Sequence, residues 1–287
     1  MPKLSPWSKR SAAIGSILLV LSIFVACGDD DSDFATRPDE KDSSSSVAPQ
    51  SSSSVKSSSS AKSSSSAKSS SSSVTLAIPC KTDSTDTCEY GELVDDRDGQ
   101  TYKTVSIGTQ TWMAENLNYE TTNSYCYSDN VSNCTKYGRL YTWAAAMDCV
   151  GTWSTNGKGC GYGKTCSPTY PVRGVCPEGW HLPTQTEWNT LFTAVGGQST
   201  AGKMLKSTSG WYSSGNGTDA YSFSALPAGY GSDYGYYGNE GDNAHFWSST
   251  ENGSYSAYGM YLDYYDDNAY LDNSVKDYGF SVRCVKD

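Results

Sequence analysis

Residues 176–197 read CPEGWHLPTQTEWNTLFTAVGG and hold the clearest helix signal in the chain. Pro183 precedes Thr184, and Thr184 and Glu187 have the spacing of a capping box, in which each side chain binds a free amide of the first helical turn. Four apolar residues then recur at helical spacing before two glycines: Trp188, Leu191, Phe192 and Val195. This pattern predicts a helix over residues 184–195 with one aromatic face in a core.

Strand signals lie on both sides of this helix. An Asp-Gly pair at 98–99 predicts a turn before a strand at 101–107, and a glycine separates that strand from a second one at 111–117, so we expect a hairpin. A second helix is predicted over the alanine-rich residues 140–147. Further short strands are predicted at residues 221–226, 244–249, 256–262 and 279–285. Helices come early and strands late, which indicates an α+β domain with two helices and a small antiparallel sheet, in which we expect the two ends of the domain to pair.

The N-terminus has the layout of a secretory signal, because three basic residues precede an apolar run at residues 12–26. This run is shorter than the roughly 20 residues that a membrane-spanning helix needs. It ends at Phe24-Val25-Ala26-Cys27-Gly28, which resembles the lipobox of bacterial lipoproteins, although Phe24 stands where leucine is usual. We therefore expect residues 1–26 to be a signal peptide and Cys27 to carry a lipid that anchors the protein in the outer membrane of the cell envelope, exposed at the surface. Ordinary secretion is the alternative.

A serine-rich segment follows the apolar run. Serine occupies 21 of the 31 positions from residue 43 to residue 73, a composition that cannot bury a core. A flexible coil of about 30 residues spans about 30 Å. We expect residues 27–75 to be a disordered tether that holds the rest of the chain away from a membrane. Residues 76–93 would then be a short connector with a cystine loop, and residues 94–287 the folded domain.

Nine cysteines remain once Cys27 is assigned to a lipid, and a secreted protein enters an oxidising compartment, so disulfides are favoured over metal sites. The spacing favours three local pairs, Cys80 with Cys88, Cys126 with Cys134 and Cys160 with Cys166, and one long-range pair, Cys176 with Cys284. Closing that long loop removes about 4 to 5 kcal/mol of unfolded-state entropy in the simple chain model. Cys149 is left over, either as a small buried hydrophobic residue or in place of one of these partners.

Acidic residues outnumber basic ones by 31 to 21, which gives a formal net charge of −10. An acidic surface repels phosphate backbones, so nucleic acid is not an expected partner. The two histidines, His181 and His245, are too few for a cluster of imidazole ligands, and the chain lacks a Cys-x2-Cys pair, so a zinc site is not expected. His181 directly precedes the start of the predicted helix, and we expect a structural role for it.

Four strings together resemble one known family: IGTQTWMAENLNY at residues 107–119, CPEGWHLPT at 176–184, FWSST at 246–250 and GFSVRCV at 279–285. They are similar to the Fibrobacter succinogenes major paralogous domain, and the resemblance covers about residues 94–287. That domain is in turn similar to the C-type lectin-like fold and to the domain of formylglycine-generating enzymes, which share the Leu-Pro-Thr-x-x-Glu-Trp helix start and a final Gly-Phe strand. The resemblance implies a C-type lectin-like fold, and the family has no settled activity to transfer.

Tyrosines are concentrated in residues 221–270, a region of short predicted strands and loops. In a lectin-like fold the long-loop region commonly binds the ligand. A tyrosine offers a flat apolar face and a polar tip at low cost in side-chain entropy, which suits contact with sugar rings or with another protein. We expect a surface-anchored, non-catalytic binding or adhesion module for a polysaccharide or a surface protein, unless these side chains only pack the loops. The candidate ligand-binding residues are Tyr234, Tyr236, Tyr237, Tyr261, Tyr264 and Tyr265.

Oxygen-bearing side chains in the same region suggest a structural calcium site, although no other cofactor is expected. Calcium takes six to eight oxygen ligands. The candidates are Asp263, Asp266, Asp267, Asn268, Asp272 and Asn273, with Glu240, Asp242 and Asn243 earlier in the chain. Their spacing is not that of an EF-hand, and acidic residues on exposed strands are usually only solvated.

Two other functions stay open. An enzyme is disfavoured, because formylglycine-generating oxidases use a close pair of reactive cysteines with copper, and the final strand here offers Cys284 alone. The chain has no Gly-x-Ser-x-Gly motif, the nucleophile turn of many serine hydrolases. A pair of acids for glycoside hydrolysis stays open, because such a pair is defined by the distance between two carboxyl groups, which a sequence does not give. The other alternative is a structural component of the envelope, in which tyrosines meet neighbouring copies or other proteins.

Overall fold

The structure is a computed structural model that describes residues 76–232 and 235–287. The predicted signal peptide, Cys27 and the serine-rich tether lie outside the described residues, and so does Tyr234. Within the described part, no helix is both long enough and apolar enough to cross a membrane. The domain has the mixed α+β architecture that the sequence predicts.

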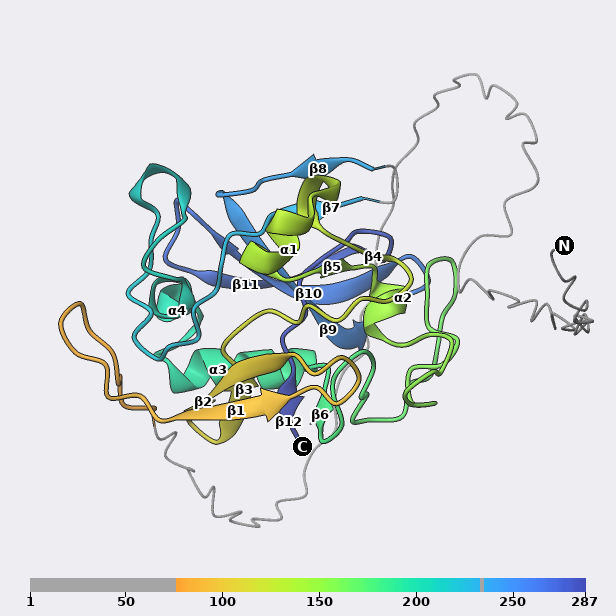
Figure 1. Ribbon diagram of the computed structural model, residues 1–287, viewed down its shortest axis with the longest axis horizontal. Coiled ribbons are helices and arrows are strands. Elements are labelled where there is room, and N and C mark those ends of the chain that lie inside the picture. The colour runs from red at the N-terminus through yellow and green to blue at the C-terminus, as the bar shows by residue number, and fades with distance from the viewer. Residues whose placement is uncertain (1–75, 233–234) are drawn as a thin grey trace, which may run out of the picture.

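The first sheet joins the two ends of the domain (Figure 1). Its five antiparallel strands follow the order β1 (Tyr90–Val94), β2 (Thr101–Ile107), β3 (Gln110–Met113), β12 (Val285–Lys286) and β6 (Trp180–His181). The predicted hairpin is formed by β2 and β3. Val285 pairs with Trp112 on one side and with His181 on the other, so the end of the chain is built into this sheet, as expected.

The folded domain begins before residue 94, the predicted boundary. Strand β1 pairs with β2, and the backbone amides of Ala77 and Cys80 bind the carbonyl oxygens of Ala194 and Ala220. Residues 76–93 are therefore part of the domain and not a connector. The pattern did not reveal β1 because Leu93 is its one buried side chain, so the strand has no apolar alternation.

A second sheet of three antiparallel strands follows the order β11 (Ala269–Val275), β10 (Ser256–Asp263) and β9 (Asn243–Glu251). Helices α3 (Gln185–Ala194) and α4 (Gln198–Leu205) pack against it (Figure 1). Helix α3 has the predicted capping box, in which Glu187 Oε2 accepts a hydrogen bond from Thr184 N at 2.8 Å. Trp188 of α3 stacks on Trp112 of β3 with ring centroids 4.6 Å apart, so one aromatic core joins the helix to both sheets.

The second predicted helix is shorter than expected. Residues 140–141 form β5 (Leu140–Tyr141), which pairs with β4 (Ser124–Tyr125), and α2 covers only Trp143–Ala146. Thr142 Oγ1 accepts a hydrogen bond from Ala145 N, so Thr142 is the cap and the helix starts after it.

The described residues contain four α-helices, and two of them were not predicted: α1 (Val131–Tyr137) and α4. Helix α1 is mostly polar, so it lacks a continuous apolar stripe. Helix α4 follows Gly197, which offers no side-chain cap, and contains Gly202, a poor helix former. Helix α1 therefore has a cap, Asn130, but no apolar stripe, and α4 has no side-chain cap.

Two of the predicted strands are mostly irregular. Residues 221–226 form no strand, because Ser222 and Ser224 have positive φ angles of 55° and 52°. Of residues 279–285, only Val285 belongs to a regular strand. The other elements are short: β7 (Tyr230–Gly231), β8 (Tyr237–Gly238) and the 3-10 turns η1 (Tyr127–Asp129) and η2 (Tyr212–Ser214).

The four disulfides have the pairing that the spacing predicts: Cys80–Cys88, Cys126–Cys134, Cys160–Cys166 and Cys176–Cys284. Cys149 takes no part in these bridges and is buried. The core clusters and these disulfides all lie within residues 76–287. This segment therefore carries the core that an independently folding unit needs.

Within the described residues, three lysine or arginine side chains are buried: Lys206, Lys276 and Arg283. Lys276 Nζ donates hydrogen bonds to Glu251 Oε1 at 2.5 Å and to the carbonyl oxygens of Lys164 and Gly161 at 2.9 and 3.2 Å. Its ammonium group also lies 4.5 Å from the ring centre of Trp143. A buried charge needs such partners, so this side chain ties a loop to the core.

Candidate functional site

Tyr261, one of the predicted tyrosines, is at the centre of a stack of rings on the three-stranded sheet. It lies in β10, opposite His245 of β9 and Tyr270 of β11. The ring centroids of Tyr261 and Tyr270 are 4.7 Å apart with planes at 14°, and those of His245 and Tyr261 are 5.7 Å apart with planes at 27°. All three side chains are half-buried. Because stacked rings cover each other's faces, solvent mainly reaches their edges and the phenolic hydroxyls.

The stack continues into β7 and the end of the chain. The ring of Tyr230 contacts His245 edge-on at 5.9 Å and stacks on Tyr278 at 5.5 Å. Tyr236 lies 6.2 Å from Tyr230 and is 60% exposed. We call this set the aromatic ladder: Tyr230, Tyr236, His245, Tyr261, Tyr270 and Tyr278. Two of its members, Tyr236 and Tyr261, are predicted ligand-binding residues, and the structure brings them into one continuous row of rings.

His245 contributes a neutral ring to the aromatic ladder. It stacks on Phe280 with ring centroids 4.7 Å apart, and burial lowers the pKa of His245 to about 4. The imidazole is therefore uncharged at pH 7. His245 was not among the residues predicted to bind a ligand. Alternate residues of a strand share one face, so the position of His245 between Asn243 and Trp247 was the sequence feature that could have placed it on this face of the sheet.

Tyr237 lies beside the aromatic ladder and anchors a loop. Its hydroxyl donates a hydrogen bond to Asp129 Oδ1 at 2.6 Å, and its ring centroid is 5.3 Å from that of Tyr127. Burial, together with the negative charge of Asp129, raises the pKa of Tyr237 above its ordinary value. The hydroxyl of this predicted ligand-binding residue is thus occupied by a protein partner.

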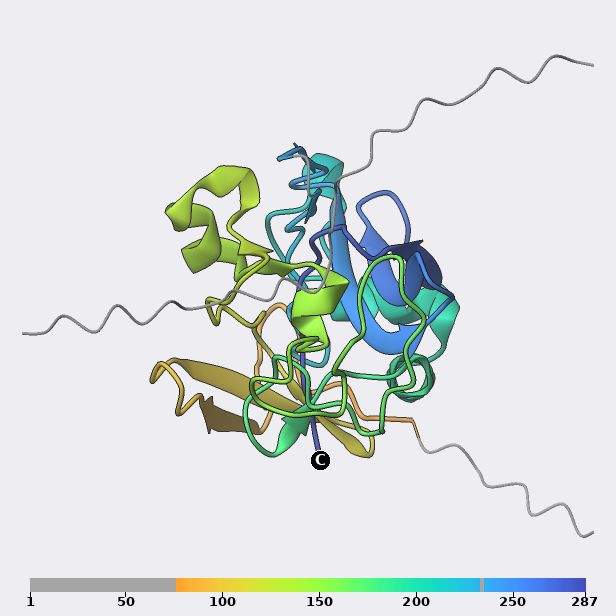
Figure 2. The same cartoon turned by 90° about the vertical axis from the view of Figure 1, so that its right-hand side faces the viewer.

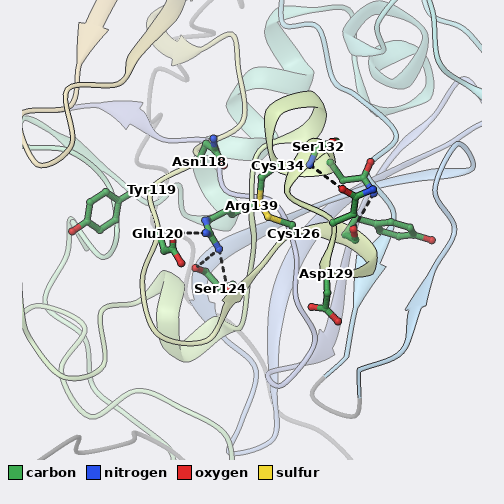
Figure 3. Close-up of a disulfide and its surroundings, with 12 residues drawn as sticks. Asn118, Tyr119, Glu120, Ser124, Cys126, Asp129, Ser132, Cys134 and Arg139 are labelled. Carbon is green, nitrogen blue, oxygen red and sulfur yellow. Dashed lines mark hydrogen bonds and ion pairs between the residues drawn. A yellow bond between two sulfur atoms is a disulfide. The ribbon is translucent and has the colours of Figure 1, made fainter.

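The loop that carries Asp129 is closed by the Cys126–Cys134 disulfide (Figure 3). After this loop, Arg139 binds Glu120 Oε2 at 2.7 Å and donates a hydrogen bond to the carbonyl oxygen of Ser124 at 3.2 Å. A covalent bridge and an ion pair therefore position η1 and α1, against which Tyr237 packs.

Tyr264 and Tyr265 border a cavity of about 350 Å³ between α4, η2 and the turn after β10. The ring of Tyr264 contacts that of Tyr212 at 5.4 Å and that of Tyr265 at 5.3 Å. Tyr212 and Tyr265 are 64% and 74% exposed. We call this cavity the tyrosine pocket, and its lining includes Lys203, Lys206, Asn216, Tyr264, Tyr265 and Asp267. Because the turn after β10 connects Tyr261 to Tyr270, it joins the tyrosine pocket to the aromatic ladder.

Two of the carboxylates named as calcium candidates, Asp263 and Asp266, have protein partners. Lys206 Nζ donates hydrogen bonds to the carbonyl oxygens of Asp263 and Asp266, both at 2.8 Å. The carboxylate of Asp263 accepts a hydrogen bond from Asn243 at 2.7 Å, and that of Asp266 accepts one from Tyr270. Residues 76–232 and 235–287 contain no group of three or more His, Cys, Asp or Glu side chains that could hold a metal ion. In this turn, a lysine ammonium thus binds backbone carbonyl oxygens beside two of the candidate carboxylates.

His181 connects three segments of the fold. Its Nδ1 lies 2.6 Å from Asp287 Oδ1, and its Nε2 lies 2.7 Å from Glu187 Oε1. Burial disfavours the charged imidazole, but the two carboxylates outweigh burial and raise the pKa of His181 above its ordinary value. The side chain thereby ties β6 to the start of α3 and to the last residue of the chain.

Comparison with known proteins identifies the family. No curated protein and no solved structure matches the chain. The family model of the Fibrobacter succinogenes major domain matches residues 105–286, which is more than half of the chain. The matched segment contains the aromatic ladder and the tyrosine pocket. The chain therefore belongs to the Fibrobacter succinogenes major domain family.

Proposed function

We propose that the protein is a non-catalytic binding module, which binds a polysaccharide through the aromatic ladder and the tyrosine pocket. The observation that carries this proposal is the exposed end of the ladder, where the ring of Tyr236 lies 6.2 Å from that of Tyr230 and is 60% exposed. A sugar ring has apolar faces and hydroxyl groups at its edges, and a tyrosine matches both with its ring and its phenolic oxygen.

The rings of both sites are held in place by the fold. Tyr261 and Tyr270 are fixed by strand pairing, and Tyr264 is packed between Tyr212 and Tyr265. Side chains that are already ordered lose little conformational entropy when a ligand binds, so less of the binding free energy is spent on ordering them. This supports binding over a purely space-filling role for the exposed rings.

We also propose a fold family and a cellular location for the protein. We assign a C-type lectin-like fold to the folded domain, and we assign the protein to the outer membrane as a lipoprotein anchored through Cys27. The apolar run that ends at Cys27 and the serine-rich segment after it support this location. The four disulfides also suit an oxidising compartment.

A glycan microarray probed with residues 76–287 tests the proposal and selects the ligand. Affinity electrophoresis with the selected polysaccharide then compares Tyr236→Ala with Tyr255→Ala, a matched control that removes a ring 58% exposed and outside the ladder. We expect Tyr236→Ala to weaken binding by about tenfold or more, as loss of a central aromatic contact does, and Tyr255→Ala to leave it unchanged. No glycan binding on the array, or equal binding by both variants, would contradict the proposal.

Sedimentation velocity separates this role from an assembly role, since exposed tyrosines also occur at protein interfaces. We expect residues 76–287 to sediment as a monomer at every concentration tested. A concentration-dependent dimer that Tyr236→Ala dissociates would favour the assembly role instead.

A further inference from the structure

A polar cleft of about 480 Å³ shares no residue with the aromatic ladder or the tyrosine pocket. Residues of β1 and β2, of the segment 114–118, of α1 and of the segment 222–226 line it. Figure 2 shows α1, in yellow-green, and β1 and β2, in gold, on the same side of the molecule. Its volume lies within the roughly 300–1,000 Å³ of small-molecule sites. We call it the basic cleft.

The basic cleft concentrates positive charge in an acidic domain. Residues 76–287 contain 13 Lys or Arg and 24 Asp or Glu, a formal charge of −11. Four of these cations line the cleft: Lys81, Lys103, Lys136 and Arg283. Two of them have carboxylate partners, since Lys81 lies 2.6 Å from Asp219 and Lys136 lies 3.5 Å from Glu240.

The charges of Lys103 and Arg283 are not neutralised by an ion pair within the described part of the chain. Lys103 is exposed, and its Nζ lies 5.6 Å from the centre of the Tyr90 ring. Arg283 is fully buried and binds neutral acceptors, Asn116 Oδ1 at 2.8 Å and the carbonyl oxygen of Ser224 at 2.9 Å. Burial lowers the pKa of Arg283 to about 9, which leaves the guanidinium charged at pH 7. Both charges therefore attract an anion to the cleft.

Two carboxylates line the same cleft and limit which anion can enter. Asp86 Oδ2 accepts a hydrogen bond from the Tyr90 hydroxyl at 2.7 Å, and Glu115 Oε2 accepts one from the Lys103 amide at 2.7 Å. A polyanion with more than one charge per unit would be repelled more strongly by these groups and by the net charge of the domain. A ligand with one carboxylate and several hydroxyls per unit fits better, because its hydroxyls can donate to the carboxylates while its own charge meets the lysines.

From this combination we infer that the basic cleft binds a uronate unit, a sugar that bears a carboxylate, of an acidic polysaccharide. The Lys103 ammonium pairs with the sugar carboxylate, and Lys136, whose ammonium lies 3.5 Å from Glu240, is part of the same lining. Gln100 and Glu115 bind the ring hydroxyls. The inference rests on the proposed function in that the ligand is a polysaccharide, and it names the chemical class. It uses a different set of residues, so the two sites can be tested separately.

Calorimetric titration of residues 76–287 with trigalacturonate and with neutral cellotriose tests the inference. We expect trigalacturonate to bind about tenfold more tightly than cellotriose, and its Kd to rise as NaCl is raised from about 50 to about 300 mM, because salt screens exposed charges. Lys103→Gln should raise the Kd for trigalacturonate about fivefold, a loss typical of a charge-assisted contact. Lys103→Arg, which keeps the charge, and Lys158→Gln, which removes an exposed lysine outside the cleft, should retain binding.

Several results would overturn the inference. They are equal affinity for both trisaccharides, absence of trigalacturonate binding, or unchanged trigalacturonate binding in the Lys103→Gln, Lys136→Gln double variant. If polymer binding that depends on Tyr236 persists in any of these cases, the basic cleft is excluded and the proposed function stands. If trigalacturonate binding depends on Lys103 while Tyr236→Ala leaves polymer binding unchanged, the cleft stands and the proposed tyrosine site falls.

Discussion

Two kinds of aromatic residue occupy different regions of this domain, with most of its tryptophans inside and many of its tyrosines at the surface. Trp188 and Trp247 are fully buried, whereas Tyr236 and Tyr265 are 60% and 74% exposed. The ring of Trp188 contacts those of Trp112, Phe223 and Phe246, so it is surrounded by other rings. The difference indicates that the interior rings supply stability and that the surface rings leave area for a ligand.

The interior rings also hold the buried cations. Lys276 lies 4.5 Å from the ring centre of Trp143, and Arg283 lies 4.4 Å from that of Phe223. Such cation–π contacts stabilise a charge that has lost its water. We therefore expect substitutions inside the domain to change the free energy of unfolding, and substitutions of the exposed tyrosines to change ligand binding alone.

Trp188→Ala should produce the largest effect on stability. The variant removes a ring that joins α3 to both sheets, and a buried aromatic residue replaced by alanine costs about 3–5 kcal/mol. Urea denaturation of residues 76–287 gives the free energy of unfolding. Tyr265→Ala is the matched surface control and should change it by less than about 0.5 kcal/mol. Similar losses in both variants would remove the distinction between interior and surface rings.

Lys276→Met should destabilise the domain by about 3 kcal/mol, because it leaves the Glu251 carboxylate and two carbonyl oxygens without their shared donor. Lys158→Met, at an exposed position, is the control for loss of a lysine. Adding Glu251→Gln to the Lys276→Met variant should restore part of the loss, since the unpaired charge is then gone. A Lys276→Met variant as stable as the parent would show that the buried ammonium does not support the core.

Stability should also depend on pH through His181, with a smaller effect. Its pKa is raised above about 6.5 in the folded state, so its ion pairs contribute fully below about pH 6.5 and are lost as the pH rises through the folded-state pKa. We expect the free energy of unfolding to fall as the pH rises above about 6.5, and His181→Asn to flatten this dependence. His245, whose pKa is about 4, stays neutral in the folded state over that window. An unchanged pH dependence in His181→Asn would assign the fall to another group.

Helix α3 could be predicted because its signals lie close together in the sequence. The disulfides could be predicted because few cysteines are present and their spacing limits the possible pairs. The cap at Thr184, the apolar stripe and the terminal glycines of α3 lie within one short segment. The β2–β3 hairpin was predicted for the same reason, since a glycine marks its turn. The region of residues 221–226 was predicted wrongly, because the Asp219 carboxylate accepts hydrogen bonds from the backbone and side chain of Ser224 and holds a bend where the pattern predicts a strand.

The candidate site could be predicted only as a region. The density of tyrosines indicated the region in which the rings lie, but contacts between strands determine which rings meet, and His245 joins Tyr261 only through the β9–β10 pairing. Buried lysines could not be foreseen either, because a lysine in a loop is normally solvated. The carboxylates of Asp263 and Asp266 were named as calcium candidates because the sequence does not show that Asn243 and Tyr270 donate hydrogen bonds to them.

The most direct test of the central claim measures stability and affinity on the same variant. Tyr236→Ala of residues 76–287 is unfolded in urea and, in parallel, titrated with the polysaccharide selected on the array. The predicted result is a free energy of unfolding within about 0.5 kcal/mol of the parent and an affinity about tenfold lower. An unchanged affinity, or a loss of affinity matched by a large loss of stability, would contradict the assignment of the exposed tyrosines to ligand binding.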